Sequence, residues 1–321
     1  MLFERTPTLD ALGDPLVRHA VQRFAGAGLA ADRFALTLLV HAHDRTGRHA
    51  PLAWRGYASR GDAQFYPCSV VKVFIMAAVE AALAEGALEA TPEIERAMRD
   101  MIRWSSNTAT NYLIDHYTGT TGDTELAPDV MAQWAAARER INIWLMSLGL
   151  HEFSGINIAQ KLMDDDRYGR EAEFVKWRGE NHHNRLSANA AASMLARIMD
   201  GAMVSAEASA RMAQRLLRPR DAAFAATPGA QVSGYLGERL PESVKVWSKA
   251  GWTGWTRDPL ASYRRHDALH VATPEGLRYT LAVFTEGEAV SADDTVLPGI
   301  GEMVFEALSQ AYPQGLVVDA V

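Results

Sequence analysis

The chain has 321 residues, 48% of them hydrophobic and 22% charged, which is an ordinary composition for a globular protein. Its net charge of −7 at pH 7 leaves no basic excess that would attract nucleic acid or an anionic membrane. Its single cysteine, Cys68, excludes an intrachain disulfide. No apolar run reaches membrane-spanning length, and the N-terminal region lacks the apolar core of a secretory signal. We therefore expect a cytoplasmic protein built as two domains or as one two-lobed domain.

The periodicity of apolar residues places strands towards both ends of the chain and helices between them. Helical spacing occurs over 10–28, 69–86, 91–104, 107–117, 128–148, 187–199, 206–217 and 297–312. Runs typical of strands occur over 34–40, 51–57, 243–248, 268–272 and 279–284. The stretch 150–186 is highly charged and lacks clear periodicity, and loops of that length are usually functional or disordered.

Two separated groups of strands around a helical block predict an α/β fold of the α+β type. We expect one antiparallel sheet built from both ends of the chain and flanked by the N- and C-terminal helices, with an all-helical lobe inserted. The α/β lobe would comprise 1–66 and 230–321, and the helical lobe 67–229, within a single domain.

The first motif with chemical meaning is a serine and a lysine three residues apart at the start of an apolar helix. Helical spacing places Ser69 and Lys72 on one face, and burial there disfavours the charged ammonium. A neutral amine beside a hydroxyl is a nucleophile with its base. The alternative is a core helix with one snorkelling lysine, because the pattern is common by chance.

Two more motifs follow in order. Ser105-Ser106-Asn107 stands at the junction of two predicted helices, where a hydroxyl and an amide can face a cleft or merely cap a helix. Lys249-Ala250-Gly251 follows a predicted strand, and its glycine lets a ligand approach the backbone closely. The alternative for the third motif is a strand that ends in a turn with a solvated lysine.

In this order and spacing, the three motifs resemble the S-x-x-K, S-D-N and K-T-G elements of class A β-lactamases and penicillin-binding proteins. The resemblance covers nearly the whole chain and implies a serine hydrolase without a metal or other cofactor. It implies Ser69 as the nucleophile and Lys72 as its base. Ser105 would relay a proton to the leaving group, and Asn107 would orient the substrate amide and Lys72.

In the third motif, the resemblance implies that Lys249 supplies positive potential to the cleft. The backbone N–H groups of Ser69 and of Trp252, which follows Gly251, would form the oxyanion hole. The sequence also departs from the family pattern, because Ser106 replaces an aspartate and Ala250 replaces a hydroxyl residue. Trp252 is larger than the usual residue, and Trp247, Trp252 and Trp255 would narrow the cleft.

The family's deacylating glutamate lies in a loop before the helix that begins near Ser187. Glu171 is nearest the expected distance, and we expect it to activate water, with Glu173, Glu180 or a histidine of the His182-His183 pair as alternatives. For a substrate carboxylate, the resemblance suggests Arg265 or His266, beside the strand after the third motif.

Other polar groups have simpler interpretations. His41 and His43 share a strand face, but a metal site would need further ligands nearby, so strand-end solvation is the interpretation adopted. Asp164-Asp165-Asp166 is interpreted as a solvated loop, with a contact for a cationic substrate as the alternative. Cys68 is expected to be a buried structural thiol.

These observations favour a cytoplasmic serine amidase or peptidase acting on a small amino-acid-derived substrate. Cytoplasmic relatives with this fold include glutaminases and the hydrolases of β-aspartyl-arginine, the dipeptide released from cyanophycin, and the tract 65–74 looks more like that of the second group. The acidic loop would suit a guanidinium group, and Arg265 a carboxylate. The alternatives are a class A β-lactamase or D-alanyl peptidase, and a non-catalytic binding protein. A homo-oligomer is compatible with the sequence, and neither a nucleic-acid nor a membrane partner is expected.

Overall fold

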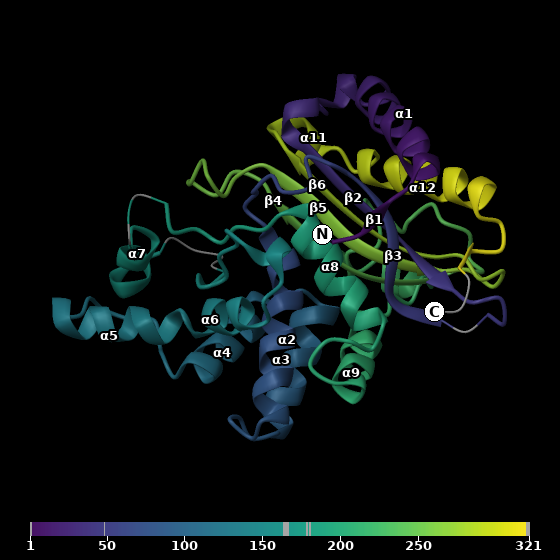
Figure 1. Ribbon diagram of the computed structural model, residues 1–321. Helices are drawn as coiled ribbons and strands as arrows, with labels where there is room; N and C mark the ends of the chain where they lie inside the picture. The colour runs from purple at the N-terminus through teal and green to yellow at the C-terminus, as the bar shows by residue number, and fades with distance from the viewer. Residues whose placement is uncertain (1, 48, 163–166, 178, 180, 319–321) are drawn as a thin grey trace.

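The computed structural model describes residues 2–47, 49–162, 167–177, 179 and 181–318. Its centre is one seven-stranded sheet, in which six strands follow the order β1-β3-β2-β6-β5-β4 and β7 pairs with β2. The strands are β1 (Glu4–Arg5), β2 (Phe34–His43), β3 (His49–Ser59), β4 (Lys245–Thr253), β5 (Arg264–Ala272), β6 (Arg278–Glu286) and β7 (Leu316–Val317). Figure 1 shows this sheet in the upper part of the molecule, with strands from both ends of the chain side by side.

The two ends of the chain meet where β2 pairs antiparallel with β6, from Phe34 opposite Thr285 to Val40 opposite Tyr279. The predicted sheet from both chain ends is therefore confirmed. Both strands are buried along nearly their full length, because helices cover both faces of the sheet. β4 lies at the edge and has only β5 as a full-length neighbour.

Helices α1 and α12 cover one face of the sheet, and α8 covers the other (Figure 1). Helix α11 lies on the same side of the sheet as α1 and α12, and the other described helices form the lobe below and beside the sheet. The helices are α1 (Pro7–Arg23), α2 (Val71–Ala84), α3 (Pro92–Arg103), α4 (Asn107–Thr118), α5 (Pro128–Arg138), α6 (Arg140–Ser147), α7 (Gly169–Val175), α8 (Ala188–Met199), α9 (Ala206–Leu216), α10 (Ala222–Ala225), α11 (Glu288–Ala292) and α12 (Val296–Ala311). None of the described helices is long and apolar enough to cross a membrane.

The helix starts follow the capping residues in the sequence. Thr91 caps α3 by accepting from Ile94 N, and Ser187 caps α8 by accepting from Ala190 N. The single helix predicted over 128–148 is wrong, since α5 and α6 are separated at Glu139. The Glu139 carboxylate accepts from Asn142, three residues later, at 2.7 Å and lies 2.9 Å from His182 Nε2, a distant partner that helical periodicity does not reveal.

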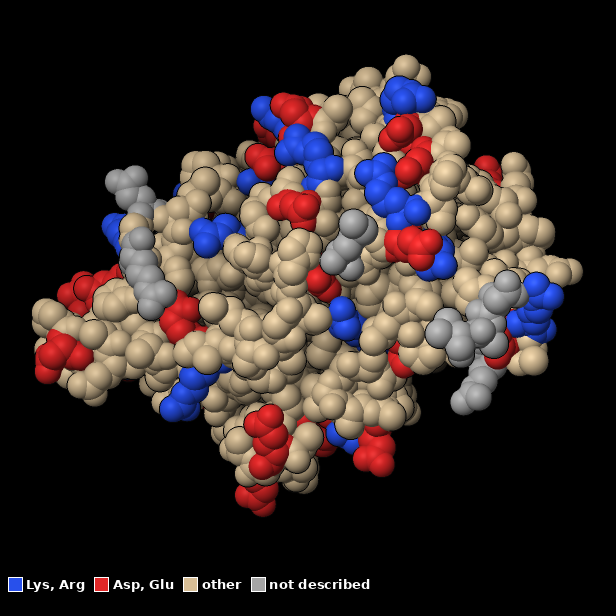
Figure 2. Space-filling view, in the orientation of Figure 1, with Lys and Arg blue, Asp and Glu red and all other residues tan. Residues whose placement is uncertain are grey.

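The α2 helix is the central element of the helical lobe. Twelve of its fourteen residues are buried, among them Lys72 and Glu80. Buried charges need partners, and two arginines of α9, Arg211 and Arg215, pair with the Glu80 carboxylate at 2.7 and 2.6 Å. On the face seen in Figure 2, acidic and basic side chains are interspersed over the sheet-bearing part of the molecule.

Candidate active site

Ser69 lies in a short 3-10 turn, Cys68–Val70, that leads directly into α2. The chain enters this turn through Cys68, whose φ of 48° lies in the left-handed region that non-glycine residues rarely adopt. Strained backbone of this kind clusters at functional sites. Ser69 is half-buried, and Lys72 follows one helical turn later as a fully buried residue.

The second motif converges on Lys72. Its Nζ donates to Asn107 Oδ1 at 2.8 Å, to the Ser105 carbonyl at 2.5 Å and to Ser105 Oγ at 3.2 Å. Ser105 reaches this position with a φ of 56°, at the junction of α3 and α4. Ser106 caps α4 by accepting from Ala109 N at 3.1 Å, so its side chain has the capping role that the sequence left open.

The third motif converges on the same hydroxyl. Lys249 Nζ donates to Ser105 Oγ at 3.0 Å, which places two buried lysines on one serine oxygen. Lys249 also donates to the Gln231 side chain and to the Ala250 carbonyl. Burial, and then the charge of Lys72, hold the pKa of Lys249 well below its ordinary value. An amine in such a site loses its proton more readily than in water, as a general base requires.

Two residues that hold this arrangement were not identified from the sequence. Gln231 accepts from Lys249, and it lies in a short turn with no motif around it. Arg218 donates to the Ser248 carbonyl of β4 and to the Ile102 carbonyl of α3. It therefore fixes the strand of the third motif against the helix that precedes the second. No local pattern marks an arginine as buried between two lobes.

Strand β4 packs closely against the turn that carries Ser69. A Cβ atom at Gly251 would lie 2.6 Å from Ser69 N and 2.7 Å from Cys68 Cβ. Glycine is therefore required for β4 to reach the turn, as expected from its place in the motif. This contact brings the backbone next to Trp252 close to Ser69 N. The backbone N–H groups of Ser69 and Trp252 are the two predicted donors of the oxyanion hole.

Gly251→Ala should lower kcat by about a hundredfold or more, because the methyl group must push Ser69 N away from β4 and loss of one oxyanion donor costs that much. Steady-state kinetics with a correctly folded variant measure the effect. Gly254→Ala is the matched control, since a Cβ there meets only the Trp252 ring at 3.4 Å. Equal activity in the two variants would contradict this account.

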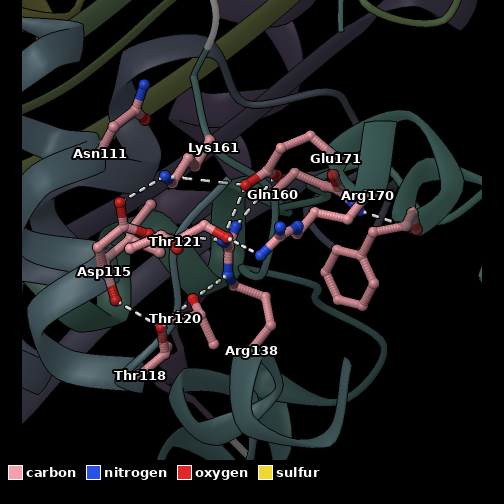
Figure 3. Close-up of polar contacts among 12 residues, drawn as sticks. Asn111, Asp115, Thr118, Thr120, Thr121, Arg138, Gln160, Lys161, Arg170 and Glu171 are labelled. Atoms are coloured by element: carbon pink, nitrogen blue, oxygen red, sulfur yellow. Dashed lines mark hydrogen bonds and ion pairs between the residues drawn. The ribbon is translucent and has the colours of Figure 1, made fainter. Parts of the chain in front are cut away.

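Glu171 belongs to a buried group of two carboxylates and two cations, shown in Figure 3. The Arg138 guanidinium binds both Glu171 oxygens, at 2.8 and 3.1 Å. Lys161 Nζ lies 2.5 Å from Asp115 Oδ2 and 3.8 Å from Glu171 Oε1. Asp115 follows Asn107 by two helical turns along α4, which is about 12 Å. The Glu171 carboxylate thus has an ion-pair partner in Arg138. Nothing in this arrangement supports the predicted role of Glu171 as the base that activates water.

Glu171→Gln should destabilise the fold by about 1–3 kcal/mol, because the fully buried Arg138 loses the carboxylate that binds it at two nitrogens and keeps only the Asp115 carboxylate, at 3.5 Å, as a counter-charge among the described residues. Chemical denaturation measures this change, and Glu173→Gln is the control, since Glu173 is exposed on the same helix. A persistent acyl-enzyme adduct in folded Glu171→Gln protein would instead support the role of base.

Comparison with known proteins places this arrangement in a family. The model of the Beta-lactamase enzyme family, Beta-lactamase2, matches residues 89–308, well over half of the chain. The chain belongs to this β-lactamase enzyme family. The match includes the second and third motifs and begins after Lys72. None of the curated proteins matches the chain.

Solved β-lactamases share the fold. The β-lactamase from Sphaerobacter thermophilus superposes with a TM-score of 0.62 and 19% identity, over 92% of this chain and 97% of that one. A mutant class A β-lactamase of the last common ancestor of Gram-negative bacteria superposes with a TM-score of 0.60 and 19% identity, over 92% of this chain and 100% of that one. A β-lactamase from Burkholderia vietnamiensis superposes with a TM-score of 0.60 and 18% identity, over 93% of this chain and 97% of that one.

The structure corrects one predicted substrate contact of this family member. His266 is fully buried, its Nδ1 accepts from Thr285 N, and its Nε2–H therefore donates to the Tyr66 carbonyl at 2.9 Å. Burial lowers the pKa of His266 to about 3, so the ring is neutral. With both ring nitrogens paired inside the protein, His266 is unavailable to a substrate. The alternation of side chains along β5 points it inward, which the motif-based reasoning did not consider.

The other predicted cleft residues lie near the end of β4. Trp252 is 50% exposed, and its Nε1 donates to the Ser291 carbonyl at 2.8 Å. Arg265 stands opposite Trp252 on β5 and donates to the Ser291 and Gly234 carbonyls. Trp255 is 58% exposed and stacks on Tyr263. The roles of Trp252 and Arg265 in substrate binding stay predictions.

The two loop histidines take separate partners. His182 Nε2 lies 2.9 Å from Glu139 Oε1, whereas His183 Nε2 lies 2.5 Å from Asp258 Oδ2. The His183 ring is 6.5 Å from the ring of Tyr66, so it is the one nearer the segment before Ser69. Asp164–Asp166 and Glu180 lie outside the described residues.

Proposed function

We propose that the protein is a serine hydrolase that cleaves an amide or isopeptide bond in a small amino-acid-derived substrate through an acyl-enzyme on Ser69. The observation that carries this proposal is the convergence of two buried lysines on Ser105 Oγ, one of which, Lys72, follows Ser69 by one helical turn. Burial disfavours the charged form of an amine, and a site that places two buried amines on one hydroxyl is suited to proton transfer.

Acylation follows from these positions. Neutral Lys72 accepts the proton of the Ser69 hydroxyl, whose oxygen attacks the substrate carbonyl carbon. The negative charge that develops on the carbonyl oxygen is stabilised by the backbone N–H groups of Ser69 and Trp252. When the tetrahedral intermediate collapses, the C–N bond breaks and Ser105 passes the proton from Lys72 to the leaving amine.

Deacylation needs a base for water. Because the proton taken from Ser69 leaves on the amine, Lys72 is neutral again in the acyl-enzyme and can accept a proton from the attacking water. Water then attacks the ester carbon, the bond to Ser69 Oγ breaks, and the proton returns to that oxygen. This route requires no carboxylate, in keeping with the ion pair that engages Glu171.

For the substrate, we propose a β-aspartyl dipeptide such as β-Asp-Arg from cyanophycin. The resemblance of the 65–74 tract to hydrolases of this dipeptide supports the choice, and Arg265 near the end of β4 offers a cation for a carboxylate. A cytoplasmic location accords with such a substrate. The second candidate is a β-lactamase or D-alanyl peptidase, which the similarity in fold to solved β-lactamases favours.

A substrate panel tests the two candidates. The purified protein is incubated with α- and β-aspartyl dipeptides and with a chromogenic cephalosporin, and amine release and absorbance are followed. We expect turnover of β-aspartyl dipeptides above that of the α-linked isomers. Preferred turnover of the cephalosporin would favour the second candidate. A fluorophosphonate probe that leaves no adduct on Ser69 by intact mass would overturn both and indicate a binding protein.

A further inference from the structure

Three potential metal ligands lie together on the α8 side of the sheet. They are His41 on β2, His49 at the start of β3 and Asp200, the C-cap of α8. One ligand atom from each lies within 4.8 Å of the others. The sequence pointed to His41 but paired it with His43. The third ligand comes from a position about 150 residues away, so the sequence alone did not reveal the group.

Asp200 is the centre of the group. Its side chain is fully buried, and it lies at the C-terminal end of a helix, where the dipole favours cations over anions. Oδ2 accepts from Leu52 N and from Trp54 Nε1, each at 2.8 Å. Oδ1 is contacted by His41 Nδ1 at 2.8 Å and by His49 Nε2 at 2.7 Å. One oxygen is thus oriented by the backbone and Trp54, while the other is contacted, within the described part of the chain, by the two imidazoles.

Hydrogen bonds to the far side of the imidazole, of the kind found behind metal-bound histidines, are also present. His41 Nε2 lies 2.8 Å from Thr280 Oγ1, and His270 Nδ1 lies 2.9 Å from the same oxygen. His270 is fully buried, and its Nε2 has no hydrogen-bond partner among the described residues. A metal-bound histidine commonly donates its other ring N–H to a protein oxygen, which fixes the tautomer. Thr280 stands where His41 would need that acceptor.

We propose that His41 Nδ1, His49 Nε2 and Asp200 Oδ1 bind a divalent transition-metal ion, with Zn²⁺ as the preferred metal. Two imidazoles and one carboxylate are a common zinc ligand set that leaves a fourth position for water. Zinc bonds of about 2.0–2.1 Å separate tetrahedral ligand atoms by about 3.3 Å. The present N–O separations would therefore open by about half an ångström on binding.

No proton has to leave the protein when the ion binds. In the metal-free state, His41 and His49 each carry a proton on the nitrogen that faces Asp200. On binding, the His41 proton moves to Nε2 and is donated to Thr280 Oγ1. The Thr280 hydroxyl then donates to His270 Nδ1, and the His270 proton moves from Nδ1 to Nε2. The His49 proton moves to Nδ1, and that side chain is 24% exposed, so water can reach it. The bonds from Leu52 N and Trp54 Nε1 to Asp200 remain.

The site would be structural and separate from the catalytic centre. His270 follows the buried His266 by four residues along β5, which is about 13 Å. The ion would tie the β2–β3 hairpin to the end of α8. Arg278 donates to the Met199 carbonyl, and its positive charge opposes a cation at this site. The Zn²⁺ affinity should therefore be lower than that of a site surrounded by anionic groups alone.

The test uses the full chain, first dialysed against a chelator. We expect Zn²⁺ to bind with a stoichiometry of one per chain and to raise Tm, and Co²⁺ to give the visible absorption of a tetrahedral site. His49→Ala should weaken Zn²⁺ binding by at least about tenfold and abolish the Co²⁺ spectrum. His43→Ala, on the same strand as His41 but outside the group, should change neither.

Equal Zn²⁺ affinity in wild type and folded His49→Ala protein would show binding elsewhere and overturn the proposal. Absence of a Tm change and of a tetrahedral Co²⁺ spectrum in the wild type would overturn it without any variant. Because His49 is partly exposed, we expect His49→Ala to fold, and circular dichroism checks this. Thr280→Val offers a second test, since loss of the acceptor for His41 should weaken binding while all three ligands remain.

Discussion

Ser69→Ala should abolish turnover while leaving the fold intact. The substitution removes one hydroxyl from a half-buried residue, and loss of a principal catalytic group costs at least about a thousandfold in rate. The measurement is turnover of the best substrate from the dipeptide and cephalosporin panel, together with Tm. A variant that keeps more than about a thousandth of the wild-type rate would show that Ser69 is not the nucleophile.

The neighbouring thiol supplies the matched control. Cys68 is buried, and burial raises its pKa to about 12, so it is protonated and weakly nucleophilic near neutral pH. Cys68→Ala should therefore keep most of the activity. Loss of activity in this variant with unchanged Tm, combined with a functional Ser69→Ala protein, would point to a thiol mechanism instead.

Lys249→Met should lower kcat/KM by about a hundredfold or more. Lys249 is a donor to Ser105 Oγ, the hydroxyl that also accepts from Lys72, and a thioether cannot replace that donor. Lys245→Met, at an exposed position of the same strand, is the control and should leave kcat/KM unchanged. An unchanged kcat/KM in folded Lys249→Met protein would mean that the Lys249 amine takes no part in the reaction.

The same substitution should change the pH dependence of stability. The pKa of Lys249 is lower in the folded protein than in the unfolded chain, so the unfolded chain binds more protons between the two pKa values. The free energy of unfolding therefore rises with pH through that interval, up to the ordinary pKa of lysine. Lys249→Met should remove this rise, which denaturation at several pH values would detect.

The sequence predicted the fold and the three motifs because both are encoded locally. Helical spacing, caps such as Thr91, and short motifs at element junctions can be recognised without knowing what lies opposite. The motifs meet in the structure because each lies at an end of an element bordering the junction of the two lobes. The resemblance of the three motifs to those of a known family predicts that residues 72, 105 and 249 form one site, and in the structure their side chains meet.

What the sequence did not predict depends on distant partners. The charge on Glu171 is compensated by Arg138 from another helix, and the Lys249 amine donates to the Gln231 side chain from a turn. Neither partner has a recognisable pattern around it. The inward direction of His266 depends on strand register, which is fixed by pairing with β4 and β6. Such contacts follow from tertiary packing, whereas propensity and spacing describe only neighbours along the chain.

The pairing of β2 with β6 has a consequence for biosynthesis. Partner residues such as Phe34 and Thr285 are about 250 positions apart, so at 5–20 residues per second the ribosome takes roughly 12–50 s between them. During that time the β2–β3 hairpin has an open, apolar edge, whereas the intervening helical lobe can already pack. We expect nascent chains that stop before β6 to aggregate through this edge and to depend on chaperones.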